Sequence, residues 1–159
     1  MDYVTVFDVG QTGFRHWWVP LPGFLFLCIG LLMYCFRSGI RSPITRAFAV
    51  ILPAFAAFWI VAAVVILGVD YFGLASHMRN GTCQVVEGFV TEFEPVPPDG
   101  RGYESFVVGG HHFCYSDYEL SAGFNRSRLH GGPIHEGLPV RIHCVGNEIA
   151  RLEIAKSSR

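Results

Sequence analysis

The spacing of apolar and polar residues divides the chain into two parts. No charged residue occurs from Trp17 to Phe36, nor from Ala47 to Val69. A helix rises about 1.5 Å per residue, so about 20 apolar residues cross the roughly 30 Å hydrocarbon core of a bilayer. A chain this short cannot build a soluble core around two helices that are apolar on every side. The pattern therefore predicts two transmembrane helices, at 17–36 and 47–69.

After the second apolar segment the pattern changes to alternation. Apolar positions recur every second residue in "TCQVVEGFVTEFEP", "ESFVVGGHHFCYS" and "LPVRIHCVGNEIARLEI", as in strands with one buried face. Gly109 with Gly110, and Gly146 with Asn147, supply the turn residues of two hairpins. About five strands are expected. The predicted fold is a membrane α-helical hairpin followed by a small all-β domain, either an OB-like barrel or a β-roll.

These patterns give the chain three regions. An N-terminal flank, 1–16, precedes a membrane region, 17–72, in which a short cationic loop joins the two helices. The soluble β domain follows at 73–159. The flank has no cationic run directly before a short apolar core, so the first segment is not expected to be a cleaved signal peptide.

The arginines predict how the chain is oriented. Arg37, Arg41 and Arg46 lie in the loop between the apolar segments, whereas Arg15 and Arg79 stand alone on the outer flanks. Short loops rich in arginine stay in the cytoplasm. We expect a multi-pass protein of the bacterial inner membrane, with both termini and the β domain in the periplasm. The net charge of -1 and the lack of a basic cluster predict no nucleic-acid partner.

The long segment 117–130, "DYELSAGFNRSRLH", is the best candidate for a binding site. A loop of this length in so small a domain is often functional, and its arginines and asparagine would donate hydrogen bonds to an anionic group. Its aromatic residues would stack or anchor a peptide. The next stretch, "LHGGPIHEGLPVRI", is interpreted as a shaped connection between strands. The candidate ligand- or partner-binding residues are Tyr118, Phe124, Asn125, Arg126, Arg128 and His130.

Cysteines and histidines offer weaker candidates. An oxidising compartment permits one disulfide among Cys83, Cys114 and Cys144, and the sequence leaves all three pairings open. His112, Cys114 and His143 are the residues to test for a metal, but HExxH and paired CxxC motifs are missing. No metal and no cofactor is therefore expected. Without a GxSxG elbow no catalytic residue is assigned either, and the chain is not expected to be an enzyme.

The run "ESFVVGGHHFCYSDYEL", with "GFNRSRLHGGPIHEGLPVRIHCVGNEIARLEI" after it, resembles the C-terminal β domain of small bacterial two-span membrane proteins of unassigned function. That resemblance brings no catalytic residues. The layout alone is similar to NfeD-like proteins, in which an OB domain follows membrane helices. It is also similar to antiphage effectors, in which a β-barrel that senses cyclic nucleotides is tethered to a membrane helix pair.

Two functions are compatible with these patterns. The first is a small inner-membrane protein that displays a β-barrel as a binding or assembly module in an envelope complex. Its partners would be the lipid bilayer and a second copy or another envelope protein. The alternative is a membrane sensor-effector, whose barrel binds a small anionic ligand of cyclic-nucleotide type and whose helices act on the membrane.

Overall fold

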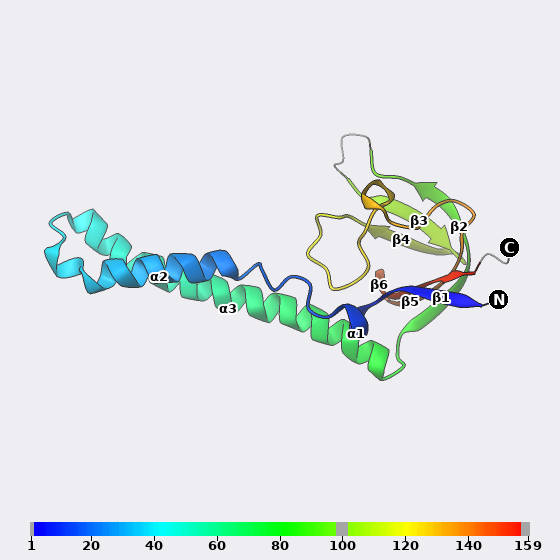
Figure 1. Ribbon diagram of the computed structural model, residues 1–159, viewed down its shortest axis with the longest axis horizontal. Coiled ribbons are helices and arrows are strands. Elements are labelled where there is room, and N and C mark those ends of the chain that lie inside the picture. Colours follow the sequence, from blue (N-terminus) through cyan, green and yellow to red (C-terminus); the bar gives the residue numbers. More distant parts are fainter. Residues whose placement is uncertain (1, 98–101, 157–159) are drawn as a thin grey trace. The chain divides into compact units, whose positions relative to one another are not determined.

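The structure is a computed structural model that describes residues 2–97 and 102–156. The chain forms two compact units (Figure 1). One consists of His16–Val69, and the other combines Met1–Arg15 with Asp70–Arg159. The second unit is thus built from both ends of the chain, with the first unit inserted between them.

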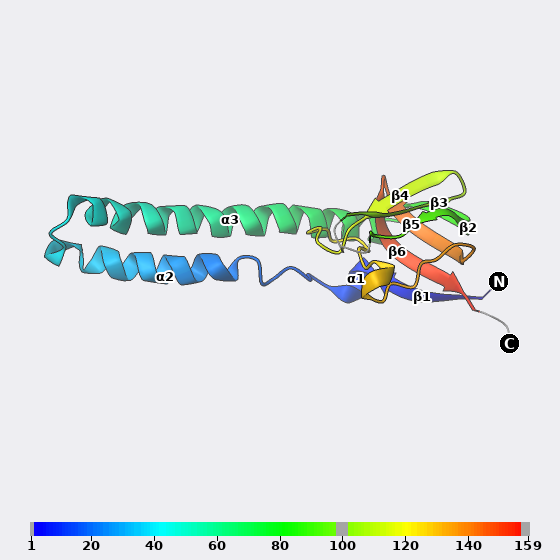
Figure 2. The same ribbon diagram turned by 90° about the horizontal axis from the view of Figure 1, so that it is seen from above.

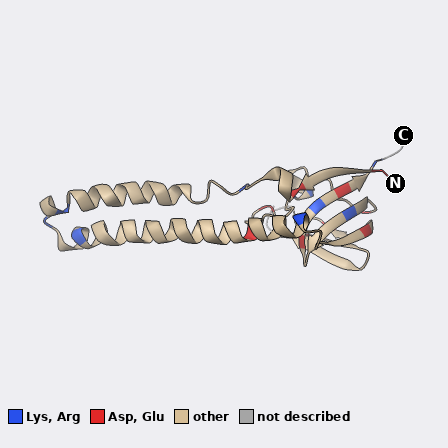
Figure 3. Ribbon diagram, turned by 90° about the horizontal axis from the view of Figure 1, so that it is seen from below, with Lys and Arg blue, Asp and Glu red and all other residues tan. Residues whose placement is uncertain are grey.

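The inserted unit is a pair of apolar helices. Helix α2 spans Leu21–Cys35, a 3-10 helix, η1, spans Arg37–Gly39, and helix α3 spans Pro43–Arg79. With 37 residues, α3 is long and apolar enough to cross a membrane. Helix α2 has 15 residues and is a shorter apolar helix. Figure 3 shows basic residues where the two helices are joined and none along α2.

Within this unit α2 and α3 lie side by side (Figure 1, Figure 2). A Cβ atom placed on Gly30 would lie 2.7 Å from Cδ of Pro53, and one on Gly23 would lie 2.7 Å from Cγ1 of Ile60. Any larger residue at either position would push the helices apart. The two glycines are seven residues apart, on one face of α2, and this face is the one that packs against α3.

The other unit is built on a six-stranded antiparallel sheet in the order β1-β6-β5-β2-β3-β4. A short helix, α1, at Val9–Thr12 follows the first strand. A 3-10 helix, η2, at Arg128–His130 lies between β4 and β5. The strands are β1 at Tyr3–Asp8, β2 at Gln84–Glu94, β3 at Glu104–Val108, β4 at His111–Tyr115, β5 at Pro139–Val145 and β6 at Glu148–Ala155.

The expectation of two apolar helices followed by a small β domain is confirmed, but the domain is not a closed OB-like barrel, and its sheet has six strands instead of about five. The sheet is open, and β1 and β4 are its two edges. Its extra strand, Tyr3–Asp8, comes from the N-terminal flank and pairs with β6 near the other end of the chain. The flank is separated from the other strands by both apolar segments, so its few alternating residues gave no local sign of a partner.

The expected hairpins are confirmed. Gly109 and Gly110 join β3 to β4 with φ angles of 57° and 82°, a conformation that glycine adopts without strain. Gly146, with φ of 60°, begins the turn between β5 and β6. The long strand β2 changes partners along its length, pairing with β5 at residues 84–89 and with β3 at residues 90–94.

The core of this unit lies against the sheet and includes the end of α3. Phe106, Phe113, Ile142 and Leu152 are fully buried strand residues. Leu74 and Ala75, in the last turns of α3, belong to the same cluster as Phe7 and Val9. The last turns of the apolar helix are therefore part of the hydrophobic core of the β unit.

Candidate functional site

The segment from Ser116 to Leu138 joins β4 to β5 and contains all six sequence-predicted binding residues. Two of the six are buried. The ring of Phe124 packs edge-on against Phe7 of β1, at 5.6 Å, and against Tyr115 of β4, at 5.4 Å. The Phe124 backbone N–H donates to the carbonyl of Ile149, at 2.9 Å. Phe124 thus fills the gap between the two edges of the open sheet.

The side chain of the other buried residue, Asn125, forms its hydrogen bonds within the protein. Its Oδ1 accepts a hydrogen bond from the Arg15 guanidinium at 2.8 Å, and its Nδ2 donates to the Glu119 carbonyl at 2.8 Å. Burial, aided by the nearby charge of Arg126, lowers the pKa of Arg15. Asn125 therefore holds the segment against the arginine that precedes the first apolar stretch.

A second contact joins the loop to α3. The backbone N–H of Ala122 donates to Oδ2 of Asp70 at 2.8 Å. Asp70 follows directly after Val69, the last residue of the second uncharged stretch. The same loop is thus bonded to the residues that border both apolar stretches.

The remaining candidates point outward. Tyr118 is 72% exposed, and Arg126, Arg128 and His130 are also exposed, as are the apolar residues Leu120 and Leu129. These side chains form an accessible mixed surface of aromatic, aliphatic and basic groups. The structure therefore brings the six predicted residues together on one loop, with two of them facing inward and four facing solvent.

Ser127, His130 and Asp117 form a cluster that invites comparison with a catalytic triad. Nδ1 of His130 lies 3.0 Å from Oδ2 of Asp117 and 3.5 Å from Oγ of Ser127. In a triad the carboxylate and the hydroxyl occupy opposite ring nitrogens, whereas here both face the same one. Asp117 also accepts the backbone N–H of Ser127, at 2.8 Å, so the cluster holds the loop closed and is not arranged for nucleophilic attack.

Burial raises the pKa of Asp117, but its hydrogen bonds from Ser127 and His130 outweigh this effect, and the pKa is lowered overall.

The same segment is also held by Glu104 of β3, whose side chain is fully buried. Oε1 of Glu104 accepts the hydroxyl of Tyr115 at 2.5 Å, and Oε2 accepts the backbone N–H of Arg128 at 2.8 Å. Burial raises the pKa of Glu104 despite these bonds, and raises that of Tyr115 as well.

The residues considered for a metal lie on two strands that are not neighbours in the sheet. His112 and Cys114 are on β4, and His143 is on β5, with β2 and β3 between them in the sheet order. Among residues 2–97 and 102–156 no group of three histidine, cysteine or acidic side chains is placed to hold a metal ion.

The three cysteines of the β unit are free thiols in this structure. Cys144 is fully buried, and its Sγ faces the carbonyl of Gln84 at 3.6 Å. Burial raises the pKa of Cys144, and the neighbouring Cys83 raises it further. Burial also raises the pKa values of Cys83 and Cys114. A disulfide among these residues stays a prediction.

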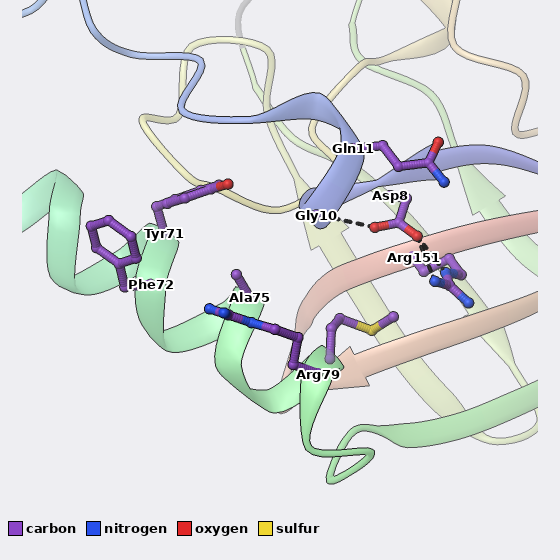
Figure 4. A pocket seen from close by; sticks show the side chains of 9 residues that line it. Asp8, Gly10, Gln11, Tyr71, Phe72, Ala75, Arg79 and Arg151 are labelled. Atoms are coloured by element: carbon purple, nitrogen blue, oxygen red, sulfur yellow. Dashed lines mark hydrogen bonds and ion pairs between the residues drawn. The ribbon is translucent and has the colours of Figure 1, made fainter.

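Sequence reasoning missed a cavity of about 580 Å³ within the β unit (Figure 4). Its walls come from the end of β1, from α1, from the last turns of α3 and from β6. Asp8 and Arg151 meet inside it, with Nε of Arg151 2.7 Å and Nη2 2.5 Å from Oδ2 of Asp8. The lining residues are Asp8, Gly10, Gln11, Tyr71, Phe72, Ala75, Met78, Arg79 and Arg151.

One local signal for this site was present in the sequence. Asp8 accepts the backbone N–H of Gly10 at 2.8 Å and caps the short helix α1, as an aspartate before a helix commonly does. The partner of Asp8 across the sheet, Arg151, is 143 residues away in sequence. Only the pairing of β1 with β6 brings the two together.

Comparison of the chain with protein families, with curated proteins and with solved structures finds no match.

Proposed function

We propose that this protein crosses the membrane twice and holds its β domain on one side of the bilayer as a binding or assembly module. The observation that carries the proposal is the pairing of β1 with β6. Tyr3–Asp8 precedes both apolar segments and Glu148–Ala155 follows both. Two strands of one sheet lie on the same side of a membrane, so the chain between them crosses an even number of times.

Helix α3 supplies one crossing. Its uncharged stretch from Ala47 to Val69 extends roughly 35 Å at 1.5 Å per residue, which exceeds the hydrocarbon thickness of about 30 Å. An even number then requires a return through the first apolar segment. Helix α2 alone is short for this, but hydrogen-bonded turns at residues 15–20 precede it. The apolar segment 17–36 is long enough when these turns are included.

The orientation follows from the arginines. Arg37, Arg41 and Arg46 lie between the two helices and favour a cytoplasmic loop. With this loop in the cytoplasm, the chain would be a bacterial inner-membrane protein whose two termini and β domain lie in the periplasm. The proposed partner surface is the exposed part of the loop, because aromatic residues and arginine dominate binding energy at protein interfaces. Its partner would be another envelope protein or a second copy.

Paired reporters test this topology in the full chain. Two reporters are each fused after residue 159 and, in truncated controls, after Gly39. Alkaline phosphatase is active only outside the cytoplasm. The fluorescent protein stays dark when it is exported unfolded, so it fluoresces only in the cytoplasm. Phosphatase activity at the C-terminus with fluorescence at Gly39 is the expected result. The same reporter active at both positions would overturn the two-pass proposal.

The alternative sensor-effector function is favoured by one contact pattern. The loop bonds to Arg15 through Asn125 and to Asp70 through Ala122, so a ligand that moves the loop would act on both chain segments that lead to the apolar stretches. Fluorescence at the C-terminus and phosphatase activity at Gly39 would favour this function, because the loop would then face cytoplasmic ligands.

A further inference from the structure

We propose that the cavity at the end of α3 binds the phosphate headgroup of an acidic phospholipid. The proposal rests on the membrane crossing by α3 argued above. It adds a ligand to a site that the proposed display function does not use.

The charge of the cavity fits an anion. Asp8 is 6% exposed, forms an ion pair with Arg151, and accepts hydrogen bonds from Nε of Arg151 and from the backbone of Gly10, so its negative charge is already compensated. Arg151 keeps N–H groups beyond those used on Asp8, because a guanidinium carries five. Arg79 makes no ion pair or side-chain hydrogen bond within residues 2–97 and 102–156. The lining thus has one more positive charge than negative charge.

The guanidinium of Arg79 is directed back along α3. Figure 4 shows it beside Ala75, on the side of the helix from which Tyr71 and Phe72 also project. Side chains on a helix lean toward its N-terminus, which here is the direction of the uncharged stretch. Ala75 is six residues after Val69, which corresponds to about 9 Å of helix. The headgroup layer on each side of a bilayer is about 5–8 Å thick, and an arginine side chain reaches further toward it by snorkelling.

The remaining walls fit an amphipathic ligand. Tyr71 and Phe72 stand two and three residues beyond the uncharged stretch, where aromatic residues commonly occupy the interface. Phe72 is 63% exposed, and Ala75 and Met78 continue the apolar wall. Gln11, from α1, adds an amide on the side of the cavity where Asp8 and Arg151 meet (Figure 4). A soluble phosphate would leave this apolar wall unused, whereas a lipid would place its glycerol and upper acyl carbons against it.

The test is a lipid titration of the purified full-length protein, read by native mass spectrometry. The probes are phosphatidylglycerol, phosphatidylcholine and soluble glycerol phosphate. Arg79→Gln removes the free guanidinium without leaving Asp8 unpaired. Lys156→Gln is the matched control, since Lys156 is also an exposed cation of the β unit but lies outside both the cavity and the 117–130 loop. Arg79→Lys keeps the charge and should retain part of the affinity.

Wild type and Lys156→Gln should bind phosphatidylglycerol more tightly than phosphatidylcholine, and Arg79→Gln should weaken phosphatidylglycerol binding about tenfold. Equal binding by wild type and Arg79→Gln would overturn the proposal, as would an equal loss in Lys156→Gln. Glycerol phosphate that binds as tightly as the lipid would show a soluble ligand instead. Insertion into lipid nanodiscs is measured in parallel. Failure of insertion would overturn the membrane function itself, whereas insertion without lipid preference overturns the lipid site alone.

Discussion

Phe124 offers the sharpest test of how the loop is held between the two edge strands of the open sheet. It is 7% exposed and contacts both edge strands, through Phe7 and Tyr115. Replacing a buried phenylalanine with alanine costs about 3–5 kcal/mol. The β unit has roughly 100 residues, for which 1 kcal/mol corresponds to about 4–8 °C. Phe124→Ala should therefore lower the unfolding temperature of this unit by about 12 °C or more.

Trypsin gives a local measurement of the same effect. Arg126 and Arg128 are exposed cleavage sites just after Phe124, but a protease needs the loop to open before it can bind the backbone. Cleavage follows the population of the open form when closing is fast, and each 1.4 kcal/mol is a factor of about ten. Phe124→Ala should speed cleavage at these two arginines by about a hundredfold or more.

Tyr118 supplies the control, because it is an aromatic residue of the same loop whose side chain is 72% exposed. Tyr118→Ala should change stability by less than about 0.5 kcal/mol and cleavage by no more than about twofold. Fragment masses identify which arginine is cut. If cleavage in Phe124→Ala is as slow as in Tyr118→Ala, the ring does not hold the loop against the two edge strands, and the reasoning is refuted.

Three further changes test other parts of the structure. Glu104→Leu removes the acceptor of both the Tyr115 hydroxyl and the Arg128 backbone N–H, and the unsatisfied donors should cost about 1–3 kcal/mol in thermal unfolding. The lowered pKa of Asp117 means that its stabilising effect is present above its ordinary pKa, near 4, and is lost as pH falls through the lower folded value. The protection factor of the Ser127 amide against hydrogen exchange should therefore fall below about pH 4. Gly30→Leu should destabilise the helix pair in detergent by about 1–3 kcal/mol, because even a Cβ atom there meets α3.

Each of these changes has its own control. Glu119→Leu replaces an exposed carboxylate and should leave the unfolding temperature unchanged; an equally small effect of Glu104→Leu would contradict its buried role. Asp117→Asn should remove the acid dependence of the Ser127 protection factor, and persistence of that dependence would assign it to another group. Gly68→Leu adds the same side chain where nothing lies within 4 Å, so equal losses in Gly68→Leu and Gly30→Leu would argue against close helix packing.

Local chemistry determined which elements were predictable. The hairpin at Gly109 and Gly110 was expected because its signal lies within a few residues. The long apolar stretch of α3 was expected from composition. Helix α2 begins only at Leu21, although its apolar segment starts at Trp17. Pro20 and Pro22 flank its first residue, and proline, which lacks an N–H, is best tolerated in the first turn of a helix.

Non-local pairing determined what was missed. Strand β1 could not be assigned to the sheet because its partner, β6, lies at the other end of the chain. The cavity was missed for the same reason, since its walls come from the N-terminus, the end of α3 and β6. Phe124 and Asn125 were chosen as binding residues by their chemical type. Sequence spacing in an irregular loop does not tell which side chains face inward, and both of these face the protein.

The contacts of the loop explain how binding at its surface would reach the apolar segments. Arg15 and Asp70 lie beside the two apolar stretches. Each forms a hydrogen bond with the loop, through Asn125 and Ala122. Hydrogen bonds to charged groups are roughly twice as strong as neutral ones, so displacing the loop would disturb both chain segments at once. The exposed face of this loop is therefore better placed than the outer face of the sheet to couple a partner to the helices.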